Sequence, residues 1–384
     1  MARLGDLCRF INGDRGKNYP SQADISVDGE VPFINAGHLV DGEINFSEMN
    51  YISQQKFEQL NSGKIQENDI LYCLRGSLGK KAIVKDIHKG AIASSLVIIR
   101  PDTTKLNSDY LFYALESPTV QEQMMQANNG SSQPNLSAKS VSDYTFNLPG
   151  INEQLVIVSK LAKVNELIAL RKEQIAKLDQ LVKSRFIELF EDGESPMRTV
   201  EDLCSAIVDC PHTTPKYEGE LKNPAIRTSE IKKGYIAWET MRYVSDEEYE
   251  ERTMRLKPET GDVVYGREGT FGNAAILPKG YKFCLGQRVM LLRPDYSKCT
   301  SEYLLYAVIS DDVYRQAVGK NNASTVAHVN VKDVKQFKIP LPSFDKQNQF
   351  AAFVEQTDKS KLAIQQSIDK LETLKKSLMQ EYFE

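Results

Sequence analysis

Two segments of forty residues have the most regular pattern of apolar and polar positions in the chain. Residues 152–191 and 345–384 contain neither Gly nor Pro, and a continuous helix of that length would span roughly 60 Å. Apolar side chains recur in both at intervals of seven, the repeat of a coiled coil. They are Leu161, Ile168, Ile175, Val182 and Leu189 in the first segment and Phe350, Ile364, Leu371 and Leu378 in the second, where Thr357 interrupts the series. The pattern predicts two long helices that each need a partner.

The partner of each helix could be its own domain, a second copy of the chain, or the other helix of the same chain. A helix lying on its own domain would leave much of so long an apolar stripe uncovered. We favour pairing within the chain over homodimerisation. Because the chain must run from the end of one helix through a whole domain before the next helix begins, we expect an antiparallel coiled coil with one domain at each end.

The region before the first helix has the shorter pattern of a mixed α/β domain. Residues 69–73, 81–85 and 91–99 are rich in Ile, Val and Leu and are separated by turns that contain Gly, which predicts strands. Residues 108–116 have helical spacing and begin at Ser108, a plausible N-cap; residues 301–309 repeat that pattern. Pro149 and Pro342 close the two domains before the long helices begin.

The second half of the chain repeats the first. An offset of 193 pairs Asp69 with Asp262 and holds without a gap to the C-terminus, where it pairs Phe190 with Phe383. Upstream the offset drifts to 192 and then to 196, so insertions have accumulated only in the front part of each repeat, where loops tolerate them. One part of constant length and one variable part indicate a fixed frame that carries two adjustable recognition elements.

These patterns predict two α/β (α+β) domains separated by two long helices in an antiparallel coiled coil, with an internal pseudo-two-fold repeat. We assign residues 1–150 to the first domain, 151–191 to the central helix and 192–197 to a linker. Residues 198–342 form the second domain and residues 343–384 the C-terminal helix.

Composition narrows the possible functions. The chain has 384 residues and 41% hydrophobic content, enough for two folded domains. We find no signal peptide and no stretch apolar enough to cross a bilayer, so we expect a cytoplasmic protein without membrane contact. Six cysteines without a C-x-x-C pair and only four histidines predict reduced thiols and no metal site. The net charge of −4 disfavours a simple wrapping DNA-binding protein, so any contact with DNA must come from local patches or from partners.

The whole chain resembles a known family. A variable front part ends at a proline, Asn152-Glu153-Gln154 follows at the start of a long helix, and the arrangement recurs with Pro342 and Gln347. Lys346 departs from the acidic residue expected before that glutamine. This layout resembles the specificity subunit of type I restriction-modification systems, commonly called HsdS.

The resemblance implies a non-catalytic subunit of a complex that is an adenine-N6 DNA methyltransferase and an ATP-dependent restriction endonuclease. Each front part would be a target recognition domain that reads one half of a split, asymmetric site in double-stranded DNA. The helices would set the spacing and dock two methyltransferase subunits, and two restriction subunits could join. No cofactor is expected on this chain; S-adenosylmethionine, and ATP and Mg for restriction, would be bound by the partners. A rigid coiled coil suits this role, since two readers on one face of a duplex need a separation of about 34–36 Å or a multiple of it.

The candidate DNA-binding residues lie in loops rich in Arg, Lys, Asn, Gln and Ser, the side chains that contact bases and phosphates. Two equivalent turns follow the strands at 69–73 and 262–266, and two polar segments with a repeated Asn-Asn pair form a second set. Further candidates lie in variable loops near the start of each repeat. The turns supply Arg75, Ser77, Lys80 and Lys81, and Arg267, Thr270 and Asn273; the polar segments supply Asn129, Ser131, Ser132, Gln133 and Asn135, and Asn322, Ser324, Thr325 and His328; the variable loops supply Arg15, Lys17 and Tyr19, and Lys216 and Tyr217. Lys233 and Tyr235 belong to a separate candidate phosphate patch. The alternative for the two turns is a tight hairpin with solvated charges, and the alternative for the polar segments is an ordinary surface loop. For the patch around Lys233 the alternative is a solvated turn.

Motifs for catalysis are missing. No G-x-x-x-x-G-K-[ST] phosphate loop occurs, and Asn147-Leu148-Pro149 lacks the second proline and the aromatic residue of an adenine methyltransferase. Glu220-Leu221-Lys222 could imitate a nuclease element, but the first repeat has no equivalent. The alternatives to a DNA-specificity subunit are therefore a coiled-coil scaffold that does not bind DNA and, less favoured, an autonomous nuclease.

Overall fold

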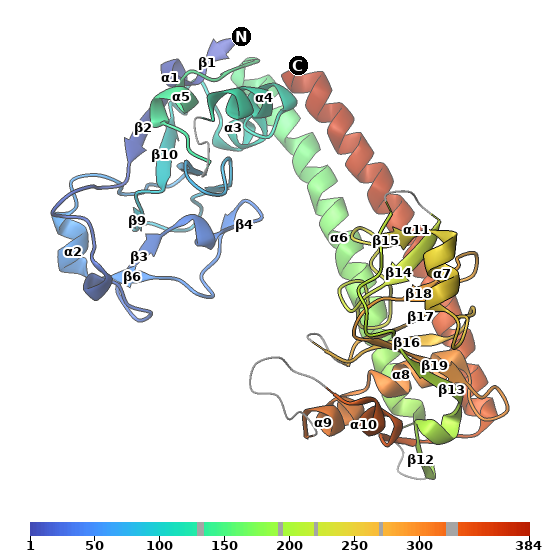
Figure 1. Cartoon of the computed structure of the whole chain (residues 1–384). Coiled ribbons are helices and arrows are strands. Elements are labelled where there is room, and N and C mark those ends of the chain that lie inside the picture. Colours follow the sequence, from blue (N-terminus) through green and yellow to red (C-terminus); the bar gives the residue numbers. More distant parts are fainter. Residues whose placement is uncertain (129–133, 191–194, 219–221, 269–271, 320–328) are drawn as a thin grey trace. The chain divides into compact units, whose positions relative to one another are not determined.

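The computed structural model describes residues 1–128, 134–190, 195–218, 222–268, 272–319 and 329–384. Contacts between Cα atoms divide the chain into two units. Unit 1 comprises residues 1–172 and 366–384, and unit 2 comprises residues 173–365. Each unit thus contains a mixed α/β part and a segment of both long helices (Figure 1).

Unit 1 is built on a four-stranded antiparallel sheet with the order β2-β10-β7-β8. A small sheet with the order β6-β3-β9 and the pairs β1-β11 and β4-β5 surround it. The strands are β1 (Ala2–Arg3), β2 (Cys8–Asn12), β3 (Val31–Ile34), β4 (Leu39–Val40), β5 (Glu43–Ile44), β6 (Tyr51–Ile52), β7 (Ile70–Cys73), β8 (Lys81–Ile83), β9 (Ala91–Ile92), β10 (Leu96–Pro101) and β11 (Thr145–Phe146). The helices are α1 (Leu4–Leu7), α2 (Gln54–Gln59), α3 (Ser108–Ala114), α4 (Pro118–Ala127) and α5 (Ala138–Ser142).

Unit 2 repeats this plan. Its four-stranded sheet has the order β13-β19-β16-β17, and its small sheet has the order β15-β14-β18. The strands are β12 (Met197–Thr199), β13 (Cys204–Asp209), β14 (Asn223–Ile226), β15 (Arg242–Val244), β16 (Val263–Gly266), β17 (Ala274–Ile276), β18 (Cys284–Leu285), β19 (Val289–Pro294) and β20 (Lys338–Pro340). The helices are α7 (Asp246–Arg252), α8 (Ser301–Val308), α9 (Asp311–Gly319) and α10 (Val331–Lys335).

The central strands β7 and β16 are buried at every position because both faces of the sheet are covered. Side chains alternate between the faces of a strand, and those of β7 divide accordingly. Ile70 and Tyr72 join the core on the side of the helices, whereas Leu71 and Cys73 join a second core on the opposite face. In unit 2, Val263 and Tyr265 of β16 lie in one core and Val264 lies in the other.

The structure confirms the strand predicted at 69–73, shortens the one at 81–85 and corrects the one at 91–99. That run is two strands, β9 and β10, because the chain changes sheets within it. β9 pairs in parallel with β3, whereas β10 pairs with β2 and β7. The predicted N-cap of the following helix was also wrong, since the side chain of Asn107 caps the Tyr110 amide and Ser108 is the first helical residue.

The two long helices are α6 (Ile151–Phe190) and α11 (Phe344–Phe383), which confirms that both exist. Each begins and ends one residue before the Gly- and Pro-free segment that indicated it, 152–191 or 345–384. They run antiparallel within each unit. In unit 1, Leu161 near the start of α6 shares a core with Phe383 at the end of α11. In unit 2, Val182 near the end of α6 shares a core with Phe350 near the start of α11.

The predicted seven-residue ladder lies on the more buried face of each helix, and the ion pairs Lys172–Glu372 and Lys361–Asp179 connect the two helices. Leu161, Val182 and Phe350 are fully buried, whereas Ile168, Ile175, Ile364, Leu371 and Leu378 are partly buried. Thr357 does not interrupt this face, because its side chain is buried and its hydroxyl donates to the Phe353 carbonyl. Ile368 and Met379 are buried positions of the same face that the sequence pattern missed.

Residues shared by the two repeats also hold each α/β part on its helices. Gln154 near the start of α6 is completely buried. Its side chain accepts from the Asn107 amide at 2.8 Å and donates to the carbonyls of Lys105 and Pro149. Gln347 of α11 makes the same three bonds with the Thr300 amide and the carbonyls of Lys298 and Pro342. The glutamine after each prolyl junction is thus a structural connection.

Candidate nucleic-acid interface

One end of the four-stranded sheet gathers the polar turns of each unit. β10 is antiparallel to both β2 and β7, so the residues that follow β2 and β7 lie beside those that precede β10. In unit 2 the same geometry brings together the residues after β13, those after β16 and those before β19. We call this part of each unit the turn end of its sheet.

At the turn end of unit 1, two polar segments that the sequence predicted separately are in contact. Nε of Arg75 donates to Oδ1 of Asn135 at 3.3 Å, and the Leu136 amide donates to the Leu74 carbonyl at 2.8 Å. Both side chains of the Arg75-Asn135 pair are exposed, as is Ser77. The structure therefore places these three candidates on one polar surface.

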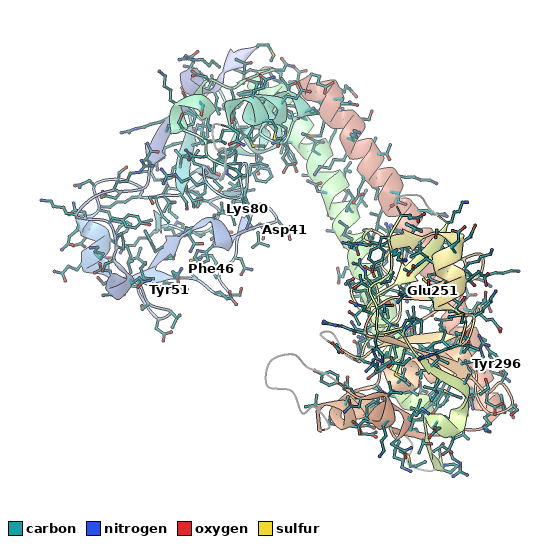
Figure 2. The ribbon with its side chains drawn as sticks, viewed as in Figure 1. Asp41, Phe46, Tyr51, Lys80, Glu251 and Tyr296 are labelled. Carbon is teal, nitrogen blue, oxygen red and sulfur yellow. The ribbon has the colours of Figure 1, made fainter. Side chains whose placement is uncertain are left out.

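Lys80 and Lys81 are adjacent in sequence but differ in their surroundings. Lys80 is partly exposed, in the region of unit 1 that also carries the labelled Asp41 and Phe46 (Figure 2). Lys81 is buried: its Nζ lies 3.0 Å from Oε1 of Glu116 and over the Phe112 ring. Burial lowers the pKa of the Lys81 ammonium, and the Glu116 carboxylate opposes that shift. The structure thus corrects Lys81 from a candidate DNA contact to a packing residue.

The loop after β2 also lies at the turn end of unit 1. Asp14 is buried and its carboxylate accepts from the Asn61 amide at 2.7 Å, which fixes the start of this loop. Arg15 and Lys17 are exposed beyond it. Tyr19 is partly buried and packs edge-on against Phe33, with ring centroids 5.8 Å apart. Two of these three candidates therefore present cations, and the third anchors the loop.

At the turn end of unit 2, Arg267 is a structural residue. Its side chain is buried, and its guanidinium lies 2.8 Å from Oδ1 of Asp209 and donates to the Val329 carbonyl. Its burial and this ion pair count against Arg267 as a DNA contact. The backbone contact between the turn and the polar segment is nevertheless repeated, because the Val329 amide donates to the Arg267 carbonyl at 3.0 Å.

The exposed cation at this place is Arg288, which the sequence reasoning missed. Arg288 precedes β19, and its Nε lies 2.9 Å from a carboxylate oxygen of Glu268. Arg288, Glu268 and the buried Arg267 line a polar pocket of about 500 Å³, together with His212, Gln287 and Asn330. The repeat offset supplies the signal that could have found this position: unit 1 has Ser94-Ser95 where unit 2 has Gln287-Arg288.

The remaining candidates of unit 2 lie on two other segments. Lys216 is exposed, and the neighbouring Tyr217 ring is covered by the Arg242 guanidinium at 4.9 Å. Lys233 pairs with Asp311 at 3.4 Å, while Tyr235 is 62% exposed on the same turn.

Asn273 supports the turn that carries Lys233 and Tyr235. Its side-chain amide donates to the Ile231 carbonyl at 3.2 Å. The structure thus links this candidate to two others, although Asn273 itself is only partly exposed. Nine further candidates lie outside the described residues: Asn129, Ser131, Ser132, Gln133, Thr270, Asn322, Ser324, Thr325 and His328.

Within the residues that the structure describes, no three His, Cys, Asp or Glu side chains converge where they could hold a metal ion. Burial raises the pKa of the Cys210 thiol beside the unit 2 pocket, so this cysteine stays protonated at neutral pH. Among the described helices, none combines the length and the apolar character needed to span a bilayer. The described turn ends offer hydrogen-bonding groups and exposed arginines, and in unit 2 both arginines are paired with carboxylates.

Comparisons with known proteins give a consistent result. The model of the type I restriction modification DNA specificity domain matches residues 1–180 and again residues 197–375. The chain is 22% identical over 403 residues to the specificity subunit of type I restriction enzyme MjaVIII from Methanocaldococcus jannaschii, a match that covers 99% of this chain and 90% of that protein. It is 26% identical over 134 residues to the EcoBI specificity subunit from Escherichia coli, which covers 35% of this chain and 28% of that relative.

Solved structures share the fold over the full length. The S subunit of a type I restriction-modification system from M. genitalium has a TM-score of 0.55 at 15% identity, with coverage of 100% of this chain and 95% of that one. A chain from a structure of type I system assembly and conformational transition has a TM-score of 0.60 at 18% identity, with coverage of 99% and 96%.

Proposed function

The chain belongs to the family of type I restriction-modification DNA specificity subunits, and we propose that each of its units reads one half of a two-part sequence in double-stranded DNA. The turn end of each four-stranded sheet faces the duplex. Exposed Arg, Lys, Asn and Ser side chains there contact base edges and phosphates. The candidates outside the described residues belong to the same proposal.

The main support for this proposal is that the two units share the architecture of their four-stranded sheets but differ in the side chains at their turn ends. Both units have the same strand order and the same hydrogen-bond register in their central strands. Their turn ends carry different side chains, with Arg75 and Asn135 in unit 1 and Gln287 and Arg288 in unit 2. Two readers with the same backbone and different side chains recognise different half-sites, so the target is not a palindrome.

In this proposal the long helices set the distance between the half-sites and dock two methyltransferase subunits. These partners bring S-adenosylmethionine and the site that accepts a flipped adenine. Two restriction subunits, which use ATP and Mg, join the complex for cleavage. The net charge of −4 suits such an assembly, because partners that enclose the duplex supply additional cations.

Methylome sequencing of cells that carry the chain with its methyltransferase tests the proposal. A two-part motif with a gap of unread bases is expected. Exchanging the residues before Pro149 for those of a relative should change one half of the motif only. Lengthening α6 and α11 together by one heptad should change the gap and leave both halves intact. A single continuous motif, or one that changes in both halves on the exchange, contradicts the proposal.

The alternative of a coiled-coil scaffold without DNA binding is disfavoured by the family match along both halves of the chain. Gel-shift titration with genomic fragments, with and without the methyltransferase, separates the two functions. Absence of sequence preference under both conditions supports the scaffold.

A further inference from the structure

Arg288 has an unusual backbone conformation for its residue type. Its φ is +67°, in the left-handed region. Three other non-glycine residues among those described have a positive φ, namely Asp41, Asn68 and Asp86. Asp and Asn tolerate this region because their short polar side chains bond locally, whereas a long side chain gains no such compensation. A strained arginine kept at an exposed position points to a role other than stability.

The backbone of the turn is held in place from several sides. The Gly286 amide donates to the Ile226 carbonyl at 2.7 Å, the Arg288 amide donates to Sγ of Cys210 at 3.2 Å, and the Arg288 carbonyl accepts from the Arg267 amide at 3.0 Å. A Cβ at position 286 would lie 2.7 Å from the Ile226 carbonyl oxygen, so only Gly fits that close approach. These contacts hold the turn around Arg288 in place, so the side chain of Arg288 starts from a defined point.

The side chain of Arg288 is presented to solvent. It is 56% exposed, and its Nε lies 2.9 Å from a carboxylate oxygen of Glu268, which also lines the pocket. Gln287 beside it is bonded to the Thr214 hydroxyl at 2.9 Å. Precise recognition of a flat ligand edge requires a side chain that is placed on a rigid element and oriented by a neighbouring group.

Unit 1 has no arginine with a left-handed backbone at the equivalent position. The equivalent of Arg288 is Ser95, which has no positive φ, although its carbonyl accepts the same backbone bond from the Leu74 amide. The frame is thus repeated and the arginine is particular to unit 2. A residue needed to hold the sheet would be expected in both units, as Arg100 and Arg293 are.

We propose that Arg288 is a specificity-determining residue of unit 2 that reads one guanine, through O6 and N7, in the half-site of this unit. The inference rests on the proposed function. An arginine that donates two parallel bonds to guanine is the commonest base-specific contact in the major groove. Glu268 orients the guanidinium before DNA arrives, and the buried Arg267–Asp209 pair lines the same pocket.

The test compares the methylation motif of the wild-type complex with those of R288A and R288K, and uses R198A as control. Arg198 is an exposed arginine of unit 2 on β12, outside the pocket. We expect R288A to relax a single G·C position in one half-site, with a 5- to 150-fold loss of discrimination, the fold-change of about 1–3 kcal/mol for one bidentate contact. R288K should relax the same position, because lysine keeps the charge and loses the planar fork. R198A should leave the motif unchanged.

When methylation becomes too weak to map, gel shifts can measure the same loss of discrimination. They compare the affinity of the complex for oligonucleotides that differ at that base pair. A uniform loss of affinity for all sequences that R288K restores would identify a phosphate contact and overturn the inference. A two-part wild-type motif that R288A leaves unchanged would overturn it while the proposed function stands. A wild-type complex without any sequence preference would overturn both.

Thermal unfolding of R288G tests the strained backbone conformation of Arg288. Glycine adopts a positive φ without strain, so R288G should be more heat-stable than R288A while reading the motif equally poorly. Lower stability of R288G than of R288A would contradict the strained conformation on which the inference depends.

Discussion

The central strands and the turn ends of the two units have diverged to different extents. In unit 1, Leu96 pairs with Cys73 and Ile70 with Ile83; in unit 2, Val289 pairs with Gly266 and Val263 with Ile276. The two pairs in unit 2 are those of unit 1 with 193 added to each residue number. A one-residue slip would turn every side chain of a strand to the opposite face, and both faces of these strands are buried. Packing on two sides therefore fixes the register, whereas the turns are free to vary.

The first strand of each sheet shows how an insertion is accommodated. In unit 1, Cys8 to Asn12 pair continuously with β10. In unit 2 the register shifts between Cys204 and Ala206, so that Ser205 is an extra residue in a β-bulge. The offset between the repeats changes there from 196 to 197. An edge strand can bulge without disturbing the sheet, so this insertion leaves the register of the central strands unchanged.

The largest expected difference between the units concerns the aromatic side chain at the end of each long helix. Phe190 packs on Phe186, Tyr303 and Phe350, with ring centroids 4.9 to 5.3 Å apart, whereas Phe383 packs on Tyr110. Truncation of either phenylalanine to Ala should cost about 3–5 kcal/mol. F190A should cost more, because each additional ring pair contributes roughly 0.5–1.5 kcal/mol.

Hydrogen exchange of the full-length chain measures this prediction unit by unit. F190A should lower protection in β16 and β19, and F383A should lower it in β7 and β10, because each phenylalanine belongs to that core. The helix ends come from opposite repeats, so F383A in the second repeat is expected to loosen the first α/β part. Loss of protection confined to the α/β part of the same repeat would contradict the antiparallel pairing.

The next largest expected loss of stability, on replacing the buried glutamine at the start of each long helix, should be equal in the two units. Q154A and Q347A each remove one acceptor and two donors from a buried site. Leaving these backbone groups unpaired should cost roughly 2–4 kcal/mol. Denaturant unfolding followed in each unit checks the equality. The variants Q154E and Q347E keep the acceptor and lose both donors, so they should not restore stability; full restoration by Glu would show that the two donated bonds contribute little.

The sequence predicted those parts of the fold whose pattern is local or periodic. The seven-residue ladder located both helices to within one residue, and the repeat showed that the units share one plan. It could not reveal that 91–99 crosses from one sheet to another, because β9 and β10 are apolar for the same reason, burial on both sides. Nor could it show that Thr357 joins the more buried face, since that depends on the bond between its hydroxyl and the Phe353 carbonyl.

The candidate site was less predictable because residue type does not reveal burial. Lys81 and Arg267 have the chemistry of DNA contacts, yet Glu116 and Asp209 hold them inside the units. Arg288 was missed because its importance lies in a backbone angle and in a comparison with Ser95. Sequence reasoning identified the polar segments of the turn end, and the structure was needed to distinguish their exposed cations from their supports.

Removal of one tyrosine hydroxyl should have a smaller effect on stability, and its sign should differ between the units. The Tyr110 hydroxyl donates to the Asn147 carbonyl at 2.8 Å, whereas that of Tyr303, its equivalent, is buried without a hydrogen-bond partner among the described residues. Y110F should cost about 0.5–1.5 kcal/mol, and Y303F should be neutral or stabilising because it removes a buried unpaired group. Both variants keep the ring contacts. Denaturant midpoints measured side by side check the signs, and equal losses in both variants would refute the asymmetry.

The smallest expected difference lies in the acid response of two equivalent turns. The Asp295 carboxylate accepts from the hydroxyl and amide of Ser297 and pairs with Lys298, and these contacts lower its pKa to about 2. Asp102 bonds Thr104 in the same way, and its pKa is also lowered.

A carboxyl group whose pKa is lowered by folding stabilises the folded state above its unfolded pKa of about 4, and that contribution is lost as the pH falls. The loss at Asp295 should therefore extend from about pH 4 to about pH 2. Carbon-detected NMR titration of the two carboxyl groups measures both pKa values, with D102N and D295N to assign the signals. We expect D295N to flatten the acid limb of the stability curve slightly. The Lys298 contact at 2.9 Å is shorter than the Lys105 contact with Asp102 at 3.4 Å, so Asp295 should titrate at the lower pH; the reverse order would show that the hydroxyl bonds outweigh the ion pair.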